Sequence, residues 1–145
     1  MLNIKLETGL ALAAIGLHAM FIAYIISFYV ALSRPIDIGS VILIPWQLLI
    51  VGIFLFGLPG FGLAGISYII ARRDVPRIVS VILIAQGILM PLGMLYSSML
   101  ANNIVEDYKS DRFLAVPQIF LIAGFAPIGL GVHLAKLKPM KRRMM

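Results

Sequence analysis

Cysteine is absent from the chain, and charged side chains make up only 12% of its residues. The lack of cysteine excludes disulfides, thiolate metal sites, iron–sulfur ligation and cysteine nucleophiles. The scarcity of charge goes with 61% hydrophobic residues and a mean hydropathy of +1.04. These values lie outside the range of an average soluble domain, so the composition indicates a membrane protein.

Four long apolar stretches account for this composition, near residues 9–32, 46–70, 78–100 and 113–135. Each is long enough to cross a hydrocarbon core of about 30 Å as a helix. We therefore predict an all-α integral membrane protein with four transmembrane helices, folded as a single domain over residues 1–145. The first apolar run continues to Leu32 and exceeds the apolar part of a signal peptide, so we expect it to stay in the mature protein.

The basic residues predict the orientation of these spans. With four spans, the N-terminus, the second loop and the C-terminus share one face, which carries nine of the twelve lysines and arginines. The positive-inside rule then predicts cytoplasmic N- and C-termini and a multi-pass protein of the cell membrane. A net charge of +6 needs no nucleic acid partner. We expect the basic tail to contact anionic lipids or a partner through four residues, Lys138, Lys141, Arg142 and Arg143.

Prolines and glycines interrupt the spans. We expect kinks at Pro59, Pro91 and Pro127, and Pro45 and Trp46 mark the start of the second helix. The second half of that helix carries small residues that favour close approach by a neighbouring helix. The predicted packing seam consists of Gly57, Pro59, Gly60 and Ala64.

Displacing the sequence by 72 positions aligns Pro45 with Pro117 and Gly52 with Gly124. Such matches are compatible with two hairpins related as a parallel repeat, and equally with chance in helices built from few residue types.

His18 is the most informative single residue, because it lies 13 positions after Lys5 and reaches a depth of roughly 20 Å from the basic face. Pro59 and Pro91 come to nearly the same depth. Each proline frees the carbonyl four residues earlier, at Leu55 and at Gly87. We expect His18 to donate a hydrogen bond to one of these carbonyls.

The deeper amide of Gln86 predicts an interhelical hydrogen bond, with a polar conduction path as the alternative. A lone imidazole falls short of the ligands that a metal needs. No nucleophile–base pair or carboxylate pair lies within a span, so we expect no catalytic residue, metal or cofactor, and no enzyme activity of the chain by itself.

Two functions follow. The first is a non-catalytic structural or accessory subunit of a larger integral membrane complex, with other membrane subunits as partners; the alternative is a small homo-oligomeric transporter or channel. The subunit hypothesis predicts that Gly57, Gly60 and Ala64 face a different chain. The transporter hypothesis predicts that they are buried in the chain's own oligomer, around a wet path past Gln86 or His18.

In its four spans, its broken segments around Pro59, Pro91 and Pro127 and its basic ending, the chain resembles the small four-helix accessory subunits of membrane metalloenzymes and respiratory complexes. Archaeal ammonia monooxygenase is one candidate host. The resemblance implies a role within a membrane oxidoreductase whose copper belongs to the larger subunits. The chain differs from small multidrug transporters, which carry a membrane-embedded glutamate in the first helix where this sequence has His18.

Overall fold

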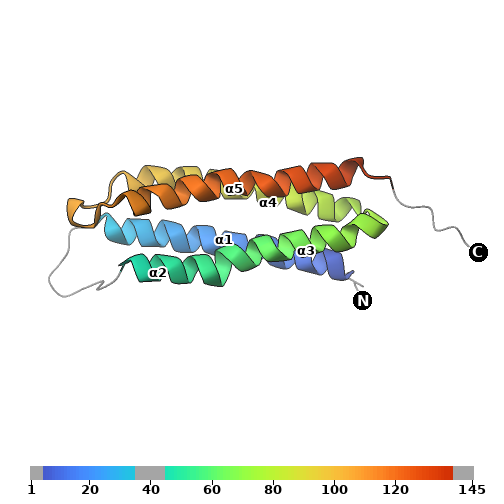
Figure 1. The fold of residues 1–145 in the computed structure, drawn as a ribbon, viewed down its shortest axis with the longest axis horizontal. Coiled ribbons are helices and arrows are strands. Elements are labelled where there is room, and N and C mark those ends of the chain that lie inside the picture. Colours follow the sequence, from blue (N-terminus) through green and yellow to red (C-terminus); the bar gives the residue numbers. More distant parts are fainter. Residues whose placement is uncertain (1–4, 35–44, 139–145) are drawn as a thin grey trace, which may run out of the picture.

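A computed structural model describes residues 5–34 and 45–138 of the chain. Four long helical segments run side by side along one axis (Figure 1). The α-helices are α1 (Leu6–Leu32), α2 (Pro45–Gly52), α3 (Leu58–Asp74), α4 (Arg77–Ala101) and α5 (Asp111–Lys136). A π-helical turn, Ile53–Gly57, joins α2 to α3 into one segment, and a short 3-10 helix, Glu106–Tyr108, precedes α5. The described residues contain no strand.

All four segments, of 27, 30, 25 and 26 residues, are long and apolar enough to cross a membrane. They indicate a multi-pass membrane protein, as the composition predicts. The segments extend beyond the predicted spans by at most four residues at either end. Pro45 is the first described residue of α2, so the predicted start of the second helix stays a prediction.

Helices α4 and α5 form the most closely packed pair of the bundle. A Cβ atom at Gly87 would lie 2.6 Å from the backbone nitrogen of Ile128, and one at Gly131 would lie 2.9 Å from the carbonyl oxygen of Ser80. The Ser80 hydroxyl also donates to the Gly131 carbonyl at 2.7 Å. Glycine therefore permits a backbone approach that any side chain would prevent.

Helix α1 lies between two neighbours and packs against both α3 and α4. Toward α3 the contact is again made by small residues, with Ala11 and Ala14 of α1 in one buried cluster with Ala64 and Ala71. Ser67 of α3 donates to the backbone carbonyl of Glu7 at 2.7 Å. These close contacts fix α1 and α3 together near the chain's N-terminus.

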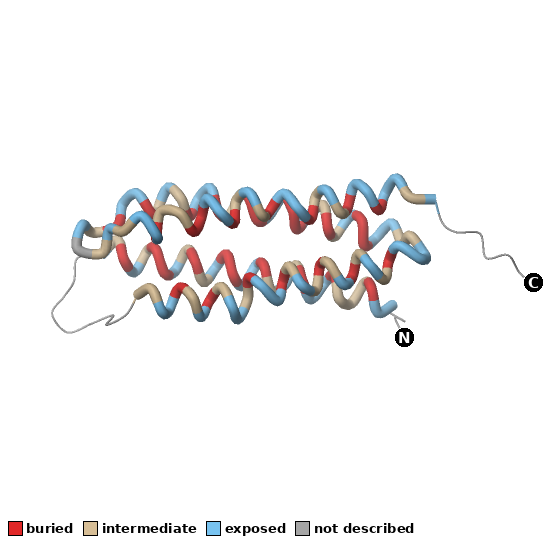
Figure 2. The backbone as a smooth tube through the Cα atoms, viewed as in Figure 1, coloured by how far each residue is buried: buried red, intermediate tan, exposed pale blue. Residues whose placement is uncertain are grey.

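Toward the other end, the interior is filled by aromatic rings. Phe21 and Phe120 lie with ring centroids 4.8 Å apart, and the buried Tyr29 hydroxyl donates to the Phe113 carbonyl at 2.5 Å. Figure 2 shows the buried positions along the inner sides of the helices and the exposed positions outside.

The prolines affect helical winding at one place. The π-helical turn ends at Gly57, directly before the α3 turn that contains Pro59, whereas α4 and α5 are continuous α-helices through Pro91 and Pro127. Pro59 removes one backbone donor, and wider winding before it is a known way to accommodate such a loss. Bends at the three prolines stay a prediction.

The aligned positions of the possible repeat differ in their surroundings. Pro117 lies inside α5, and Pro45 is the first described residue of α2. Gly52 faces the ring of Tyr24, and Gly124 faces Met90. The repeat therefore remains a hypothesis.

The start of α1, the turn between α3 and α4, and the end of α5 lie at the same end of the bundle (Figure 1). We call this the basic end, because Lys5, Arg72, Arg73, Arg77 and Lys138 belong to it. Lys5 forms an ion pair with Asp74 at 4.0 Å, and both side chains are exposed. Which side of a membrane this end faces stays a prediction.

Candidate functional site

A buried polar pair joins α1 to α4 in the interior of the bundle. Gln86 of α4 donates from its amide nitrogen to Nδ1 of His18. Both side chains are completely buried. The interhelical hydrogen bond expected of Gln86 is therefore present, and its partner is His18.

The prediction that His18 donates to a backbone carbonyl freed by a proline is wrong. Nδ1 of His18 is hydrogen-bonded to the Gln86 side chain, and Nε2 is bonded to neither the Leu55 nor the Gly87 carbonyl. Backbone carbonyls point along their own helix axis, whereas the side chain of Gln86 reaches across the space between α1 and α4. The depth of His18 was predictable, but the rotation of α4 that turns Gln86 inward was not.

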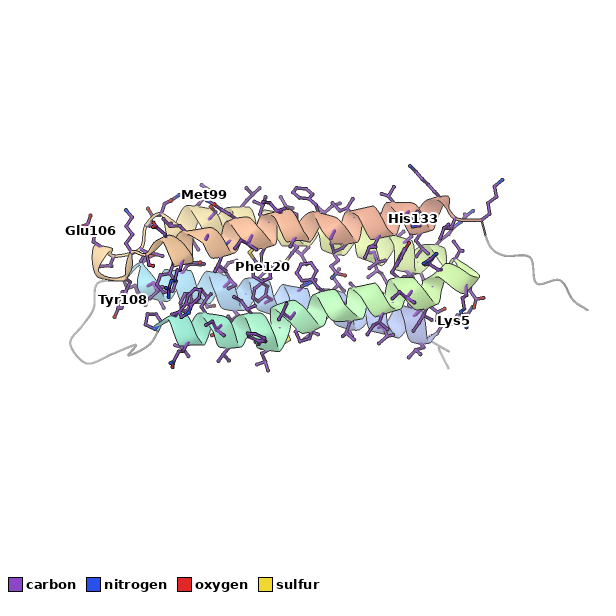
Figure 3. All side chains as sticks on the ribbon, in the orientation of Figure 1. Lys5, Met99, Glu106, Tyr108, Phe120 and His133 are labelled. Carbon is purple, nitrogen blue, oxygen red and sulfur yellow. The ribbon has the colours of Figure 1, made fainter. Side chains whose placement is uncertain are left out.

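Helix α3 closes this site from another side. A Cβ atom at Gly60 would lie 2.8 Å from Nε2 of His18, so only glycine accommodates the imidazole here. The ring of Phe61 meets His18 edge-on at a centroid distance of 4.4 Å. Phe61 in turn stacks on Phe120, which Figure 3 places near the middle of the bundle.

Two atoms of the pair, His18 Nε2 and Gln86 Oε1, are buried and have no hydrogen-bond partner within the described part of the chain. Because Gln86 donates to Nδ1, the neutral imidazole carries its proton on Nε2. The site thus offers one free donor and one free acceptor, which suit a water molecule or another small polar group. Residues 5–34 and 45–138 contain no group of three His, Cys, Asp or Glu that could hold a metal ion.

The small residues of the predicted seam lie in different places. Gly57 faces the rings of Phe21 and Phe120, and Gly60 faces His18. Ala64 is buried, whereas Pro59 is exposed on the outside of α3. Gly57, Gly60 and Ala64 are therefore helix-packing positions within this chain. Both expectations for these three, that they face a different chain or that they lie in a contact of the chain's own oligomer, are wrong, because side chains of α1 and α5 already occupy that side of the segment.

A different set of small residues does face outward, along α1. We call it the α1 outer face: Ala13, Gly16, Ala19, Ala23, Ser27 and Ala31, all exposed. A Cβ atom at Gly16 would meet nothing within 4 Å. Leu12 and Met20 are the larger exposed side chains beside it.

This face was not predicted from the sequence, although a signal for it exists. Gly9, Gly16 and Ala23 recur every seven residues, a spacing that keeps one face of a helix against a partner helix. Because α1 is apolar all round, the sequence alone does not show which side is left uncovered.

The outer side of α4 is different. Its exposed residues are mostly large and apolar: Ile78, Val81, Ile88, Leu92, Leu95 and Met99. Large aliphatic side chains of this kind suit contact with lipid tails.

Of the predicted tail contacts, Lys138 is exposed at the basic end, and Lys141, Arg142 and Arg143 lie outside the described residues.

Comparison of the chain with known protein families, with curated proteins and with solved structures finds no match.

Proposed function

We propose that this chain is a non-catalytic structural subunit of a larger integral membrane complex, and that the α1 outer face contacts a transmembrane helix of another subunit. The observation that supports the proposal is the run of exposed small side chains from Ala13 to Ala31 on α1. Small residues on a lipid-facing surface gain nothing from the lipid, but they allow two helix backbones to approach closely.

Contacts inside the bundle also indicate that small residues in this chain mark helix contacts. The chain uses glycine or alanine at several places where two of its own helices come close, as at Gly87 beside Ile128 and at Gly60 beside His18. The α1 outer face has the same kind of side chains, and none of the helices in residues 5–34 and 45–138 lies against it. A helix from another subunit is the partner that matches this surface.

The proposal assigns no catalytic step to the chain. His18 and Gln86 are bonded to each other and completely buried, which suits a role in holding α1 against α4. The architectural resemblance to accessory subunits adds a membrane oxidoreductase, such as one of the ammonia monooxygenase type, as the candidate host. In this proposal the basic end faces the cytoplasm and the complex lies in the cell membrane.

One observation favours a second candidate, the homo-oligomeric transporter or channel. His18 Nε2 and Gln86 Oε1 leave one donor and one acceptor unused in the bundle interior, and unpaired polar groups inside a membrane protein are often functional. In this case the α1 outer face would contact a second copy of the chain.

Mild-detergent extraction from the native membrane, followed by native-gel separation and mass spectrometry, tests the two candidates. Stoichiometric co-migration with a different, larger membrane protein is the result we expect. A discrete species containing only copies of this chain would overturn the proposal and support the oligomeric alternative. The chain migrating as a monomer would overturn both.

A further inference from the structure

A groove of about 320 Å³ opens at the basic end, beside the last turns of α3 and the segment that follows α5. Its lining consists of three basic and two apolar residues: Ile69, Arg72, Arg73, Leu137 and Lys138. Among the described residues, no acidic side chain lines it. The groove therefore combines a concentration of positive charge with an apolar wall.

The positive charge in this groove is not neutralised by neighbours. Within residues 5–34 and 45–138, the only ion pair is the one between Lys5 and Asp74, at 4.0 Å. Asp74 follows Arg73 directly, but its carboxylate is directed to Lys5. The other carboxyl group at this end, that of Glu7, is buried within the bundle. An anion from outside the bundle is thus the natural counter-charge for Arg72, Arg73 and Lys138.

One of these cations is held in place. The guanidinium of Arg72 lies 5.8 Å above the ring of Tyr68, a cation–π arrangement. The Tyr68 hydroxyl is hydrogen-bonded to Nδ1 of His133 on α5. Figure 3 shows His133 at the same end of the bundle as Lys5. The contact between α3 and α5 therefore positions Arg72 beside the groove.

We propose that this groove binds the phosphate of an anionic phospholipid, with Arg72, Arg73 and Lys138 contacting the phosphate oxygens. Ile69, which is 64% exposed on the outside of α3, and Leu137 contact the upper part of an acyl chain. The groove lies where the membrane-spanning part of α3 ends, at the depth of lipid headgroups, and basic pockets between transmembrane helices are known sites for such headgroups. The apolar wall favours a lipid over a soluble anion. This site does not depend on the proposed role as a subunit.

Native mass spectrometry of the detergent-purified chain tests the proposal, using phosphatidylglycerol and phosphatidylcholine with identical acyl chains as probes. We expect tighter binding of phosphatidylglycerol. The variant Arg72→Gln/Arg73→Gln should lose about twenty-five-fold in affinity for it, since each basic residue at a membrane surface contributes about fivefold. The single variant Lys138→Gln should lose about fivefold.

The matched control is Arg77→Gln/Lys136→Gln, which removes two charges at the same end but outside the groove. We expect this control to lose less than about threefold, because it acts only through screened, longer-range attraction. Equal losses in both double variants would show diffuse attraction and overturn the site. Equal affinity for the two lipids would overturn it as well.

Two further measurements separate a lipid from a free phosphate and a binding defect from a folding defect. Millimolar inorganic phosphate should fail to displace phosphatidylglycerol; full displacement would assign the groove to free phosphate instead. The variant Arg72→Lys/Arg73→Lys keeps the charge and should retain most of the binding, and it keeps the test decisive if the glutamine variant fails to fold. Loss of selectivity in the lysine variant with normal helix content would contradict a charge-based site.

Discussion

The outer sides of α1 and α4 are both exposed in the same bundle, yet they carry opposite kinds of side chain. Helix α4 presents large aliphatic residues such as Ile88 and Leu92, and α1 presents Gly16, Ala19 and Ala23 at comparable depths. The lipid around a bundle is the same on every side, so lipid contact does not explain the difference. A helix partner on the α1 side explains it, because small side chains permit close backbone contact.

The contacts between α4 and α5 show what small residues do in this chain when the partner is known. Gly87 and Gly131 lie directly against the backbone of the opposite helix. In contrast, Gly129 on the outside of α5 meets nothing within 4 Å, as does Gly16 on α1. The chain therefore contains glycines in filled contacts and glycines in open positions, and the two kinds can be tested against each other.

The largest effect on stability is expected at Gly87. The change Gly87→Ala places a methyl group against the backbone of Ile128 and should lower the free energy of unfolding by about 1–3 kcal/mol. The matched change Gly129→Ala enters open space and should be neutral or raise stability by up to about 1 kcal/mol. Thermal unfolding in detergent measures both. Equal effects would show that glycine does not mark close helix contacts here.

On the α1 outer face, the second-largest effect is expected on binding of the partner subunit. Gly16→Leu should not destabilise the isolated chain and should be neutral or raise its stability by up to about 1 kcal/mol, because no described atom lies within 4 Å of the new Cβ atom and leucine favours a helix over glycine. It should reduce co-purification with the partner subunit about tenfold, since overpacking an interface costs about 1–3 kcal/mol. Ala85→Leu, on the exposed side of α4 at a similar depth, is the control and should co-purify normally. Loss of the partner with Ala85→Leu and not with Gly16→Leu would mean that the outer side of α4, and not the α1 outer face, contacts the partner.

The inner sides of α1 and α4, unlike their outer sides, are joined by the hydrogen bond between His18 and Gln86. Leucine substitutions at His18 and Gln86, singly and together, form a double-mutant cycle. We expect a coupling energy of about 0.6 kcal/mol, the average for hydrogen bonds between membrane helices. Unfolding in detergent measures it. If a leucine variant abolishes solute flux through reconstituted vesicles while its stability is unchanged, the transporter alternative is supported and the structural role of the pair is contradicted.

The smallest effect is expected at Leu92, on the outer side of α4. Because this side chain is exposed and contacts only lipid in our account, Leu92→Ala should change stability by no more than about 0.5 kcal/mol. Co-purification of the partner should be unchanged. A clear loss of the partner would mean that α4, and not α1, carries the contact.

Much of the fold followed from hydropathy and helix geometry. The four spans agree with the structure, because an uninterrupted apolar run is a strong local signal. The predicted depth of His18, close to that of Pro59, followed from the rise per residue along a helix and agrees with its contact with Gly60.

The rotation of each helix about its axis could not be predicted in the same way. Helices that are apolar all round have no polar stripe to show which side faces the interior. For this reason the pairing of His18 with Gln86 and the inward position of Gly57, Gly60 and Ala64 required the structure. The seven-residue spacing of Gly9, Gly16 and Ala23 marks a contact side, but only the packed bundle shows that this side is left open.

The most direct test of the account is site-specific cross-linking in the native membrane, which the cysteine-free chain allows with single introduced cysteines. Ala23→Cys places a thiol on the α1 outer face, and Leu92→Cys places one at a similar depth on the outer side of α4. A thiol-specific photo-cross-linker should join Ala23→Cys to a different membrane protein and leave Leu92→Cys unlinked. Cross-linking at Leu92→Cys alone, or of Ala23→Cys only to a second copy of the chain, would contradict the account.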